Sequence, residues 1–195
     1  MAPDLLGRLL VRMLPGRIRL AGRIVEVEAY EPGDPASHGF RGPTPRNATM
    51  FGEPGHLYTY FTYGHHWMAN VVTRRAGEGS AVLLRALEPL QGLDKMAERR
   101  GREKPGDLCS GPGKLAQALE LDRSHDGADL VKGRVVWLEV GEPVPPRAIE
   151  RGPRVGVSVG MDRDWRFWER DSPWASRWRP APPPRSSRLR TTPPR

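Results

Sequence analysis

Two carboxylates and a phenol alternate with apolar residues in one short stretch of the chain. Glu26, Glu28 and Tyr30 stand at alternate positions of Arg23-Ile-Val-Glu-Val-Glu-Ala-Tyr30, and the residues between them are apolar. Period-two alternation predicts a β-strand, so these three side chains share one face. A carboxylate on that face can take a proton from water and act as a general base. Glu28 is the preferred candidate, and Glu26 competes with it for the role. A solvated strand face, whose charged side chains only point at water, is the alternative interpretation.

A long segment rich in proline and glycine follows this strand. Residues 31–46 hold four prolines and three glycines, with His38 near the middle. This composition predicts a loop, and a loop of such length in a compact domain is usually functional or disordered. His38 is therefore a candidate pocket residue. A hydrogen bond that stabilises the loop is the alternative interpretation.

Aromatic residues gather in the next part of the chain. Residues 57–63 and 67–73 read as two strands of a β-hairpin with its tip near residues 63–66, because aromatic and β-branched residues dominate both. Such aromatics usually pack in a core. A projecting hairpin with Tyr63 at its tip is also what stacking on a base, or wedging into a duplex, requires.

A possible phosphate site opens a predicted helix over residues 110–119. Gly111-Pro112-Gly113-Lys114 offers backbone N–H groups and a cation at the start of that helix, and helix starts bind anions. Gly-Pro pairs are also common at turns, so this signal is weak by itself.

The remaining patterns define the elements that position these residues. Apolar residues with helical spacing predict an amphipathic helix over residues 4–14, and another helix is expected over residues 93–100. Further strands are expected over residues 81–87, 135–140 and 154–159. Since the strands come in runs and do not alternate with helices, we expect an α+β domain with a curved, mainly antiparallel sheet, flanking helices and a protruding hairpin.

Positive charge is concentrated at the end of the chain. The net charge is +8, and residues 177–195 hold six arginines and no acid, which leaves +2 for residues 1–176. A basic tail often binds nucleic acid through phosphates, and a solvated end is the alternative interpretation. From about residue 176 the sequence is of low complexity, so we expect a folded domain over residues 1–175 and a disordered tail over residues 176–195.

The composition argues against several other classes of protein. Cys109 is the only cysteine, so an internal disulfide and a four-thiolate zinc site are excluded. None of the five histidines has the spacing of a helical zinc site, and we expect no metal and no cofactor. No stretch approaches the roughly 20 apolar residues of a membrane span. We therefore expect a soluble cytoplasmic monomer.

Taken in order, these segments resemble the successive blocks of the alkyladenine (3-methyladenine) DNA glycosylase family. Each block is weak alone, but the ordered set over roughly residues 4–175 is specific. The blocks are residues 23–30, 37–38, 44–47, 50–51, 54–55, 57–60, 63–64, 70, 82–89, 108–115, 154–157 and 171–174.

The resemblance implies a role for each matching position. Glu28 would activate water, and Tyr30, His38 and Tyr60 would stack around an extruded base. Tyr63 would fill the gap in the duplex, and Asn70 would crowd the exocyclic amine of guanine. Arg85 would lie near the DNA backbone, and Arg46 and Lys114 are further candidates for contacts with that backbone. His65-His66-Trp67 departs from the family pattern, being bulkier and more cationic than expected.

The resemblance also implies a reaction. A monofunctional base-excision-repair enzyme of this family flips alkylated or deaminated purines out of double-stranded DNA and hydrolyses the N-glycosidic bond with a Glu-activated water. Two alternatives stay open. One is a non-catalytic nucleic-acid-binding domain, and the other is a nucleoside hydrolase that uses Glu26 and Glu28.

Overall fold

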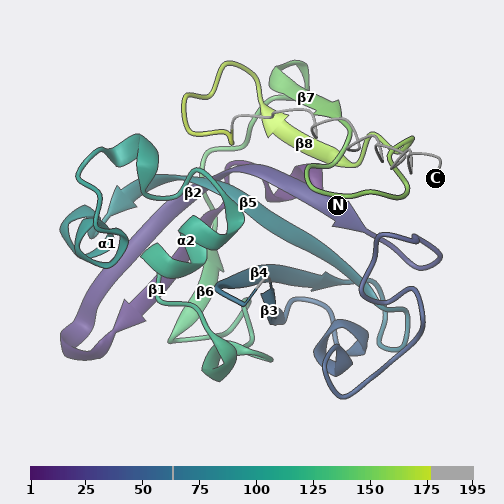
Figure 1. Cartoon of the computed structure of the whole chain (residues 1–195). Helices are drawn as coiled ribbons and strands as arrows, with labels where there is room; N and C mark the ends of the chain where they lie inside the picture. The colour runs from purple at the N-terminus through teal and green to yellow at the C-terminus, as the bar shows by residue number, and fades with distance from the viewer. Residues whose placement is uncertain (63, 177–195) are drawn as a thin grey trace, which may run out of the picture.

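The structure is a computed structural model that describes residues 1–62 and 64–176 (Figure 1). The strands are β1 (Leu9–Leu14), β2 (Ile18–Tyr30), β3 (Leu57–Thr62), β4 (His66–Thr73), β5 (Ser80–Gln91), β6 (Val136–Glu139), β7 (Ile149–Gly152) and β8 (Arg166–Glu169). The α-helices are α1 (Leu93–Arg100) and α2 (Pro112–Ala118). Short 3-10 turns span Pro3–Leu5, Pro15–Arg17, Ala48–Phe51, Pro105–Asp107, Arg123–His125 and Pro146–Ala148.

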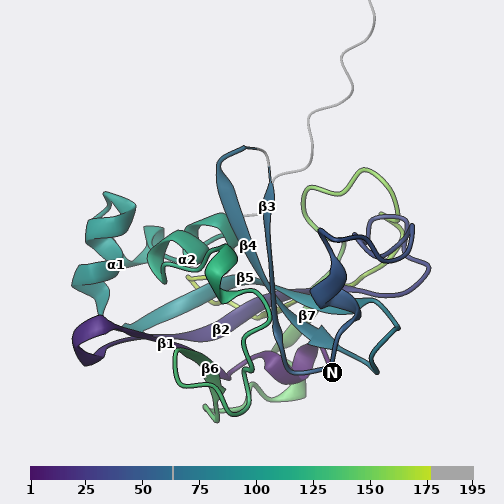
Figure 2. The same cartoon turned by 90° about the horizontal axis from the view of Figure 1, so that it is seen from below.

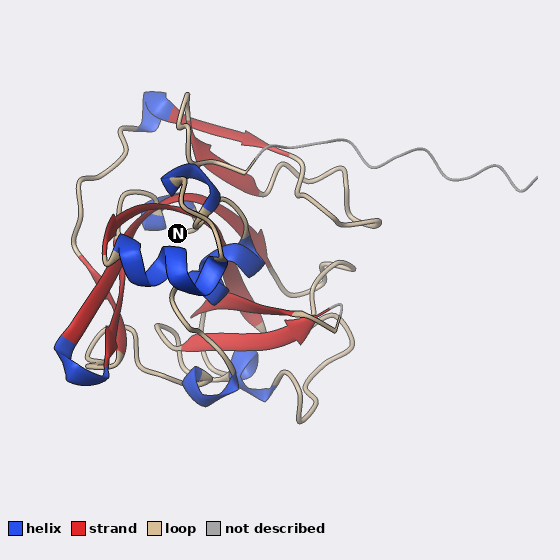
Figure 3. Cartoon of the chain, turned by 60° about the vertical axis from the view of Figure 1, so that its left-hand side comes forward, coloured by secondary structure: helices blue, strands red, loops and turns tan. Residues whose placement is uncertain are grey.

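All eight strands belong to one antiparallel sheet. Its main path runs β3-β4-β5-β2-β1-β6, and β8 joins it by pairing with both β2 and β7. α2 packs against β4 and β5, and α1 packs against α2 and β2. Figures 1 and 3 show the sheet curving around the two helices. The expected α+β fold with a curved antiparallel sheet is therefore confirmed.

The main core fills the space between the sheet and the helices. Its largest fully buried side chains come from both layers: Leu10, Leu20, Ile24, Leu57, Leu84, Leu87, Met96, Leu108, Leu115, Leu119 and Leu130. Each such burial contributes roughly 1.5–3 kcal/mol of transfer free energy. A smaller cluster of Met50, Tyr58, Val72 and Ala81 packs beneath Tyr30, Phe51 and Tyr60. This second cluster supports the aromatic side chains of the site described below.

Strand β2 is the central strand of the fold. It pairs with β1 over its first half, with β5 from Ala21 to Tyr30, and with β8 at residues 26–28. The β2–β5 register shifts around residues 24–27, which indicates a bulge. Glu26 and Glu28 are consequently enclosed by strands on both sides, and both side chains are fully buried. The interpretation of this strand as a solvated face is wrong.

Three segments project from the same side of the molecule. Figure 2 shows the β3–β4 hairpin standing out from the sheet, with the loops over residues 31–47 and 153–165 beside it. The expected protruding hairpin is confirmed, although Tyr63 at its tip lies outside the described residues. The loop expected over residues 31–46 is also present and holds no helix or strand.

The prediction of a helix over residues 4–14 is wrong. A 3-10 turn ends at Leu5, and β1 begins at Leu9. Gly7 lies between them with a φ of 85°, and a Cβ there would lie 2.1 Å from the carbonyl oxygen of Glu142. The apolar run suits a strand buried on both faces equally well, and successive residues of β1 are indeed buried while its two edges pair with β2 and β6.

The prediction of a strand over residues 154–159 is also wrong. These residues form the loop between β7 and β8, two short strands that the sequence did not predict. Gly156 and Gly160 have φ values of 79° and 61°, in the left-handed region that interrupts a strand. The strand expected over residues 135–140 is confirmed as β6, and both later helices are confirmed at nearly their expected bounds.

Candidate active site

Glu28 lies at the centre of a small hydrogen-bond network. Its Oε1 accepts the backbone N–H of Val155 at 2.7 Å, and its Oε2 accepts the hydroxyl of Tyr30 at 3.0 Å. A guanidinium nitrogen of Arg85 lies 3.2 Å from Oε2. These contacts fix the orientation of the carboxylate and offset much of the cost of burying its charge.

Arg85 is buried between two carboxylates. Its Nε donates to Glu26 at 3.1 Å, while its other contact is the one to Glu28. Burial lowers the pKa of Arg85, but the charges of Glu28 and Glu26 outweigh that effect and raise the pKa above its ordinary value. Arg85 is buried and lines the cavity described below, and its expected contact with the DNA backbone stays a prediction.

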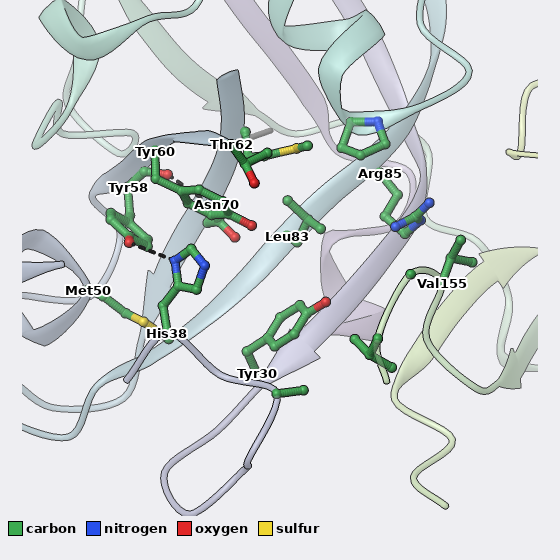
Figure 4. Close-up of a pocket in the computed structure, with 15 residues that line it drawn as sticks. Tyr30, His38, Met50, Tyr58, Tyr60, Thr62, Asn70, Leu83, Arg85 and Val155 are labelled. Atoms are coloured by element: carbon green, nitrogen blue, oxygen red, sulfur yellow. Dashed lines mark hydrogen bonds between the residues drawn. The ribbon is translucent and has the colours of Figure 1, made fainter. Parts of the chain in front are cut away.

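A cavity of about 330 Å³ opens beside this network (Figure 4). The partners of Glu28, namely Val155, Tyr30 and Arg85, all line it, so the carboxylate lies directly behind the cavity wall. The other lining residues are Ala36, His38, Met50, Tyr58, Tyr60, Thr62, Met68, Asn70, Leu83, Pro112, Gly156 and Val157. A mainly apolar cavity with a few polar groups is typical of a small-ligand site.

An aromatic cluster forms one part of the cavity wall. The rings of His38 and Tyr60 lie 4.1 Å apart between centroids, and those of Tyr58 and Tyr60 lie 5.5 Å apart. Figure 4 shows Tyr30 standing apart from this cluster on a different strand. His38 Nδ1 and the hydroxyl of Tyr58 are 3.2 Å apart and share a hydrogen bond. The cavity therefore presents aromatic rings from more than one side.

The surroundings of His38 favour the neutral form of its ring. Partial burial of the ring, and then the nearby positive charge of Arg46, lower the pKa of His38 below its ordinary value. His38 as a whole residue is nevertheless exposed, and it is one of the residues that line the cavity. A neutral imidazole can lie against a positively charged planar ligand without charge repulsion.

A buried ion pair supports Tyr30 from beneath. The guanidinium of Arg154 lies 4.6 Å from the centre of the Tyr30 ring and donates to the carbonyl oxygen of Ala29 at 3.0 Å. Arg154 also pairs with Asp34, and both side chains are completely buried. The pair thus joins the loop after β2 to the loop after β7, which carries Val155.

Asn70 is buried on β4 and points into the cavity (Figure 4). Its Nδ2 donates to the carbonyl oxygen of Tyr58 on the neighbouring strand at 3.0 Å. This bond fixes the side-chain amide, so Asn70 presents a fixed polar group to any ligand in the cavity.

Comparisons with known proteins show the family to which the chain belongs. The family model of methylpurine-DNA glycosylase matches residues 1–173. The chain belongs to the methylpurine-DNA glycosylase family. It is accordingly an N-glycosylase of DNA repair.

Several bacterial relatives carry the name of a 3-methyladenine DNA glycosylase. The protein of Chlorobaculum tepidum is 48% identical over 187 residues, which cover 95% of this chain and 88% of the relative. The protein of Burkholderia orbicola is 50% identical over 170 residues, which cover 86% of this chain and 82% of the relative. The protein of Carboxydothermus hydrogenoformans is 46% identical over 176 residues, which cover 90% of this chain and 92% of the relative.

The glycosylase brings most of its expected site residues together. Glu28 lies behind the cavity wall, and Tyr30, His38, Tyr60 and Asn70 line the cavity. Arg46 and Lys114 are not among the residues that line this cavity. Arg46 is exposed and donates to the carbonyl oxygen of Phe61 at 2.7 Å, while Lys114 donates to Ser110 Oγ at 3.1 Å.

Sequence reasoning missed three contributors to the site. Tyr58 lies two residues before Tyr60, so the alternation of β3 could have placed both rings on one face. Val155 acts through its backbone N–H, which no side-chain pattern reveals. Arg154 belongs to the family block over residues 154–157, but its partner Asp34 is 120 residues away.

The described part of the glycosylase contains no group of three or more His, Cys, Asp or Glu side chains that could hold a metal ion. Within residues 1–62 and 64–176, no helix has the length and apolar character to cross a membrane.

Proposed function

We propose that the glycosylase removes alkylated or deaminated purines, such as 3-methyladenine and hypoxanthine, from duplex DNA by hydrolysis with Glu28 as the base. The observation that carries the proposal is the placement of Glu28 directly behind the wall of an aromatic cavity, held by Val155, Tyr30 and Arg85. A base in this cavity would have its sugar near the carboxylate.

The cavity suits a purine that has left the duplex. An enzyme cannot reach the anomeric carbon of a stacked nucleotide, so the nucleotide must be flipped out at a cost of a few kcal/mol. Stacking on an aromatic ring offsets about 1–3 kcal/mol of this cost per base. Tyr30 supplies such a ring on one side of the cavity, and His38 and Tyr60 supply rings on another. Tyrosine faces also attract a positively charged alkylated purine.

Glu28 retains an acceptor position for the water. A carboxylate has about four lone-pair positions, and the contacts with Val155, Tyr30 and Arg85 occupy three of them. The remaining position, on Oε1, can accept a hydrogen bond from a water. That water then bonds to the anomeric carbon and gives its proton to Glu28, and the purine leaves with the electron pair of the glycosidic bond. The anionic carboxylate stabilises the positive charge that develops on the sugar.

The first test is a Glu28→Gln variant on a hypoxanthine-containing duplex. Glutamine keeps the shape of the side chain but is not a base, so base release in single turnover should fall below detection while the affinity for damaged DNA is retained. Glu139→Gln is the matched control, because Glu139 pairs with Arg19 on β2 outside the cavity lining. Normal turnover by Glu28→Gln would contradict the assignment and make Glu26 the next candidate.

The same assay separates the two alternatives. A nucleoside hydrolase would release hypoxanthine from free inosine without DNA, whereas the proposed enzyme should require the duplex. A non-catalytic binding domain would bind damaged duplex and produce no abasic sites. The proposal therefore predicts abasic sites in duplex DNA and no turnover of inosine.

A further inference from the structure

A second carboxylate is buried beside Glu28. The side chain of Glu26 is completely buried, and it accepts hydrogen bonds from Arg166 Nε at 2.6 Å and Arg85 Nε at 3.1 Å. The backbone N–H and the hydroxyl of Ser176 donate two more, at 2.6 Å and 2.7 Å. A buried carboxylate costs several kcal/mol unless it is well paired. The proposed reaction uses Glu28 alone as the base. The buried carboxylate of Glu26 and its four hydrogen-bond donors therefore call for a different role in the site.

Arg85 connects the two carboxylates. Its Nε is bonded to Glu26 Oε1, and a terminal nitrogen contacts Glu28 Oε2. An arginine without the Glu26 contact would tend to bind Glu28 through two parallel hydrogen bonds. That pairing would occupy the lone pair that the water needs and would weaken the carboxylate as a base. Glu26 thus restrains Arg85 to contact with a single oxygen of Glu28.

Ser176 completes this arrangement from the far end of the chain. It follows Glu26 by 150 residues and lies beyond residue 173, where the match to the family model ends. Its carbonyl oxygen accepts from Arg166 at 3.1 Å, so Ser176 and Arg166 enclose Glu26 together. The packed part of the chain therefore extends to Ser176, one residue past the expected domain boundary, whereas residues 177–195 lie outside the described residues.

The donors to Glu26 determine how firmly it holds Arg85. Glu26 Oε1 accepts hydrogen bonds from Arg85, Arg166 and the hydroxyl of Ser176, and the bond from Arg85 is the longest of the three. The backbone N–H of Ser176 binds the other oxygen. Together these bonds fix the plane of the carboxylate. Without the hydroxyl, the carboxylate can rotate, and its contact with Arg85 is the first to weaken.

We propose that Glu26 and Ser176 are positioning residues that hold Arg85 in the orientation that Glu28 requires, so that the chain up to Ser176 completes the catalytic centre. This inference rests on the proposed role of Glu28 as the base.

The test measures single-turnover base release from a hypoxanthine-containing duplex at saturating enzyme. Ser176→Ala should lower the rate constant about tenfold, in line with the loss of a hydrogen bond to a charged group. Ser176→Thr keeps the hydroxyl and should restore the rate. Ser172→Ala is the matched control, because the Ser172 hydroxyl lies in the same segment and is buried with no hydrogen-bond partner in the part of the chain that the structure describes.

Binding of each variant to a duplex with a stable abasic-site analogue separates positioning from folding. A positioning role lowers the rate constant and leaves this affinity unchanged, whereas misfolding lowers the affinity and the active fraction together. Glu26→Gln should also lower the rate constant by at least about tenfold, because Arg85 is then drawn to Glu28 alone. If Glu26→Gln does not fold, the Ser176 variants decide the question.

The outcomes distinguish this inference from the proposed function. If Glu28→Gln is inactive while Ser176→Ala and a folded Glu26→Gln keep the full rate constant, the positioning role is overturned and the proposed function stands. If Glu28→Gln itself keeps its activity, both are overturned.

Discussion

The hydroxyl of Tyr30 donates a 3.0 Å hydrogen bond to Glu28, while the ring of the same tyrosine lines the cavity. The two residues lie two positions apart on β2, so the strand itself sets their spacing. Burial, and then the charge of Glu28, raise the pKa of Tyr30 well above its ordinary value. The phenol therefore keeps its proton and remains a donor to the carboxylate.

Substitutions at Tyr30 should separate these two contributions. Tyr30→Phe keeps the ring and loses the donor, so the single-turnover rate constant should fall about tenfold with little change in DNA affinity. Tyr30→Leu loses the ring as well, and the flipped state should be weaker by a further 1–3 kcal/mol or so. Single-turnover kinetics with a fluorescent reporter of flipping would measure both. Equal loss of flipping in the two variants would show that the hydroxyl and not the ring holds the base.

The lowered pKa of His38 predicts a pH-dependent preference between lesions. Above its ordinary value of about 6.5 the imidazole is neutral, and acidification below the lowered value adds a positive charge beside the cavity. That charge repels the cationic ring of 3-methyladenine more than neutral hypoxanthine. The ratio of 3-methyladenine to hypoxanthine excision should therefore fall as the pH is lowered through the pKa of His38, which lies below its ordinary value.

The ratio is the chosen measure because a titration elsewhere that slows both substrates equally cancels in it. His38→Gln provides the control, because glutamine has no proton to gain in this range. A ratio that falls equally in His38→Gln would assign the effect to another group.

The buried Asp34–Arg154 pair should contribute strongly to stability. Asp34→Asn leaves the buried guanidinium without its anion, which should lower the free energy of unfolding by about 3–5 kcal/mol. Urea unfolding would measure this loss. Glu98→Gln is the control, since Glu98 forms an exposed pair with Lys95 and its loss should have little effect.

The pH dependence of the Asp34 contribution has a defined sign. Burial opposes ionisation of Asp34, but hydrogen bonds from Arg154 and the Ala36 N–H outweigh it, so the pKa lies below its ordinary value. The stability that the pair provides is thus complete above the unfolded pKa of about 3.9 and is lost as the pH falls through the lower, folded pKa. The difference between the original chain and Asp34→Asn should shrink at acidic pH, and a difference that grows there would contradict the assignment.

The sequence predicted the parts of the site that depend on local periodicity. Alternation placed Glu26, Glu28 and Tyr30 on one strand face, and the density of aromatic residues predicted the hairpin that carries Tyr60 and Asn70. These predictions succeeded because strand geometry alone decides which side chains share a face.

The parts that depend on distant contacts could not be predicted. Glu26 and Glu28 looked like solvated strand residues because β5, β8 and the segment ending at Ser176 enclose them only in the folded chain. Arg85 was expected at the DNA backbone, and its pairing with both carboxylates follows from the β2–β5 register. β7 and β8 have four residues each, and neither shows the period-two alternation or the apolar run that predicted β6.

Deletion of residues 177–195 should leave the folded domain and the chemical step intact. This tail carries six of the eight net positive charges and follows Ser176, the last residue that the structure describes. Loss of its phosphate contacts should weaken non-specific DNA binding and flatten its salt dependence, since each contact adds about 0.9 to the logarithmic slope. Titrations at several salt concentrations would measure the slope. An unchanged slope would show that the tail does not bind DNA.

Asn70 is the residue that we expect to exclude guanine. Normal purines stack as well as damaged ones, so rejection of guanine requires a penalty at its N2 amine, which adenine and hypoxanthine lack. The hydrogen bond from Asn70 Nδ2 to the carbonyl oxygen of Tyr58 holds the side-chain amide rigidly in the cavity wall. Asn70 can therefore oppose that amine without moving aside.

Asn70→Ser should consequently raise the excision of guanine-type bases relative to hypoxanthine, because serine is shorter and leaves room for the amine. Tyr63→Ala should act differently and slow flipping for every substrate without changing their order, since its expected place is the gap in the duplex. Single-turnover rates on hypoxanthine, alkyladenine and undamaged guanine would separate the two effects. A guanine-to-hypoxanthine ratio that Asn70→Ser leaves unchanged would mean that a different group in the cavity excludes guanine.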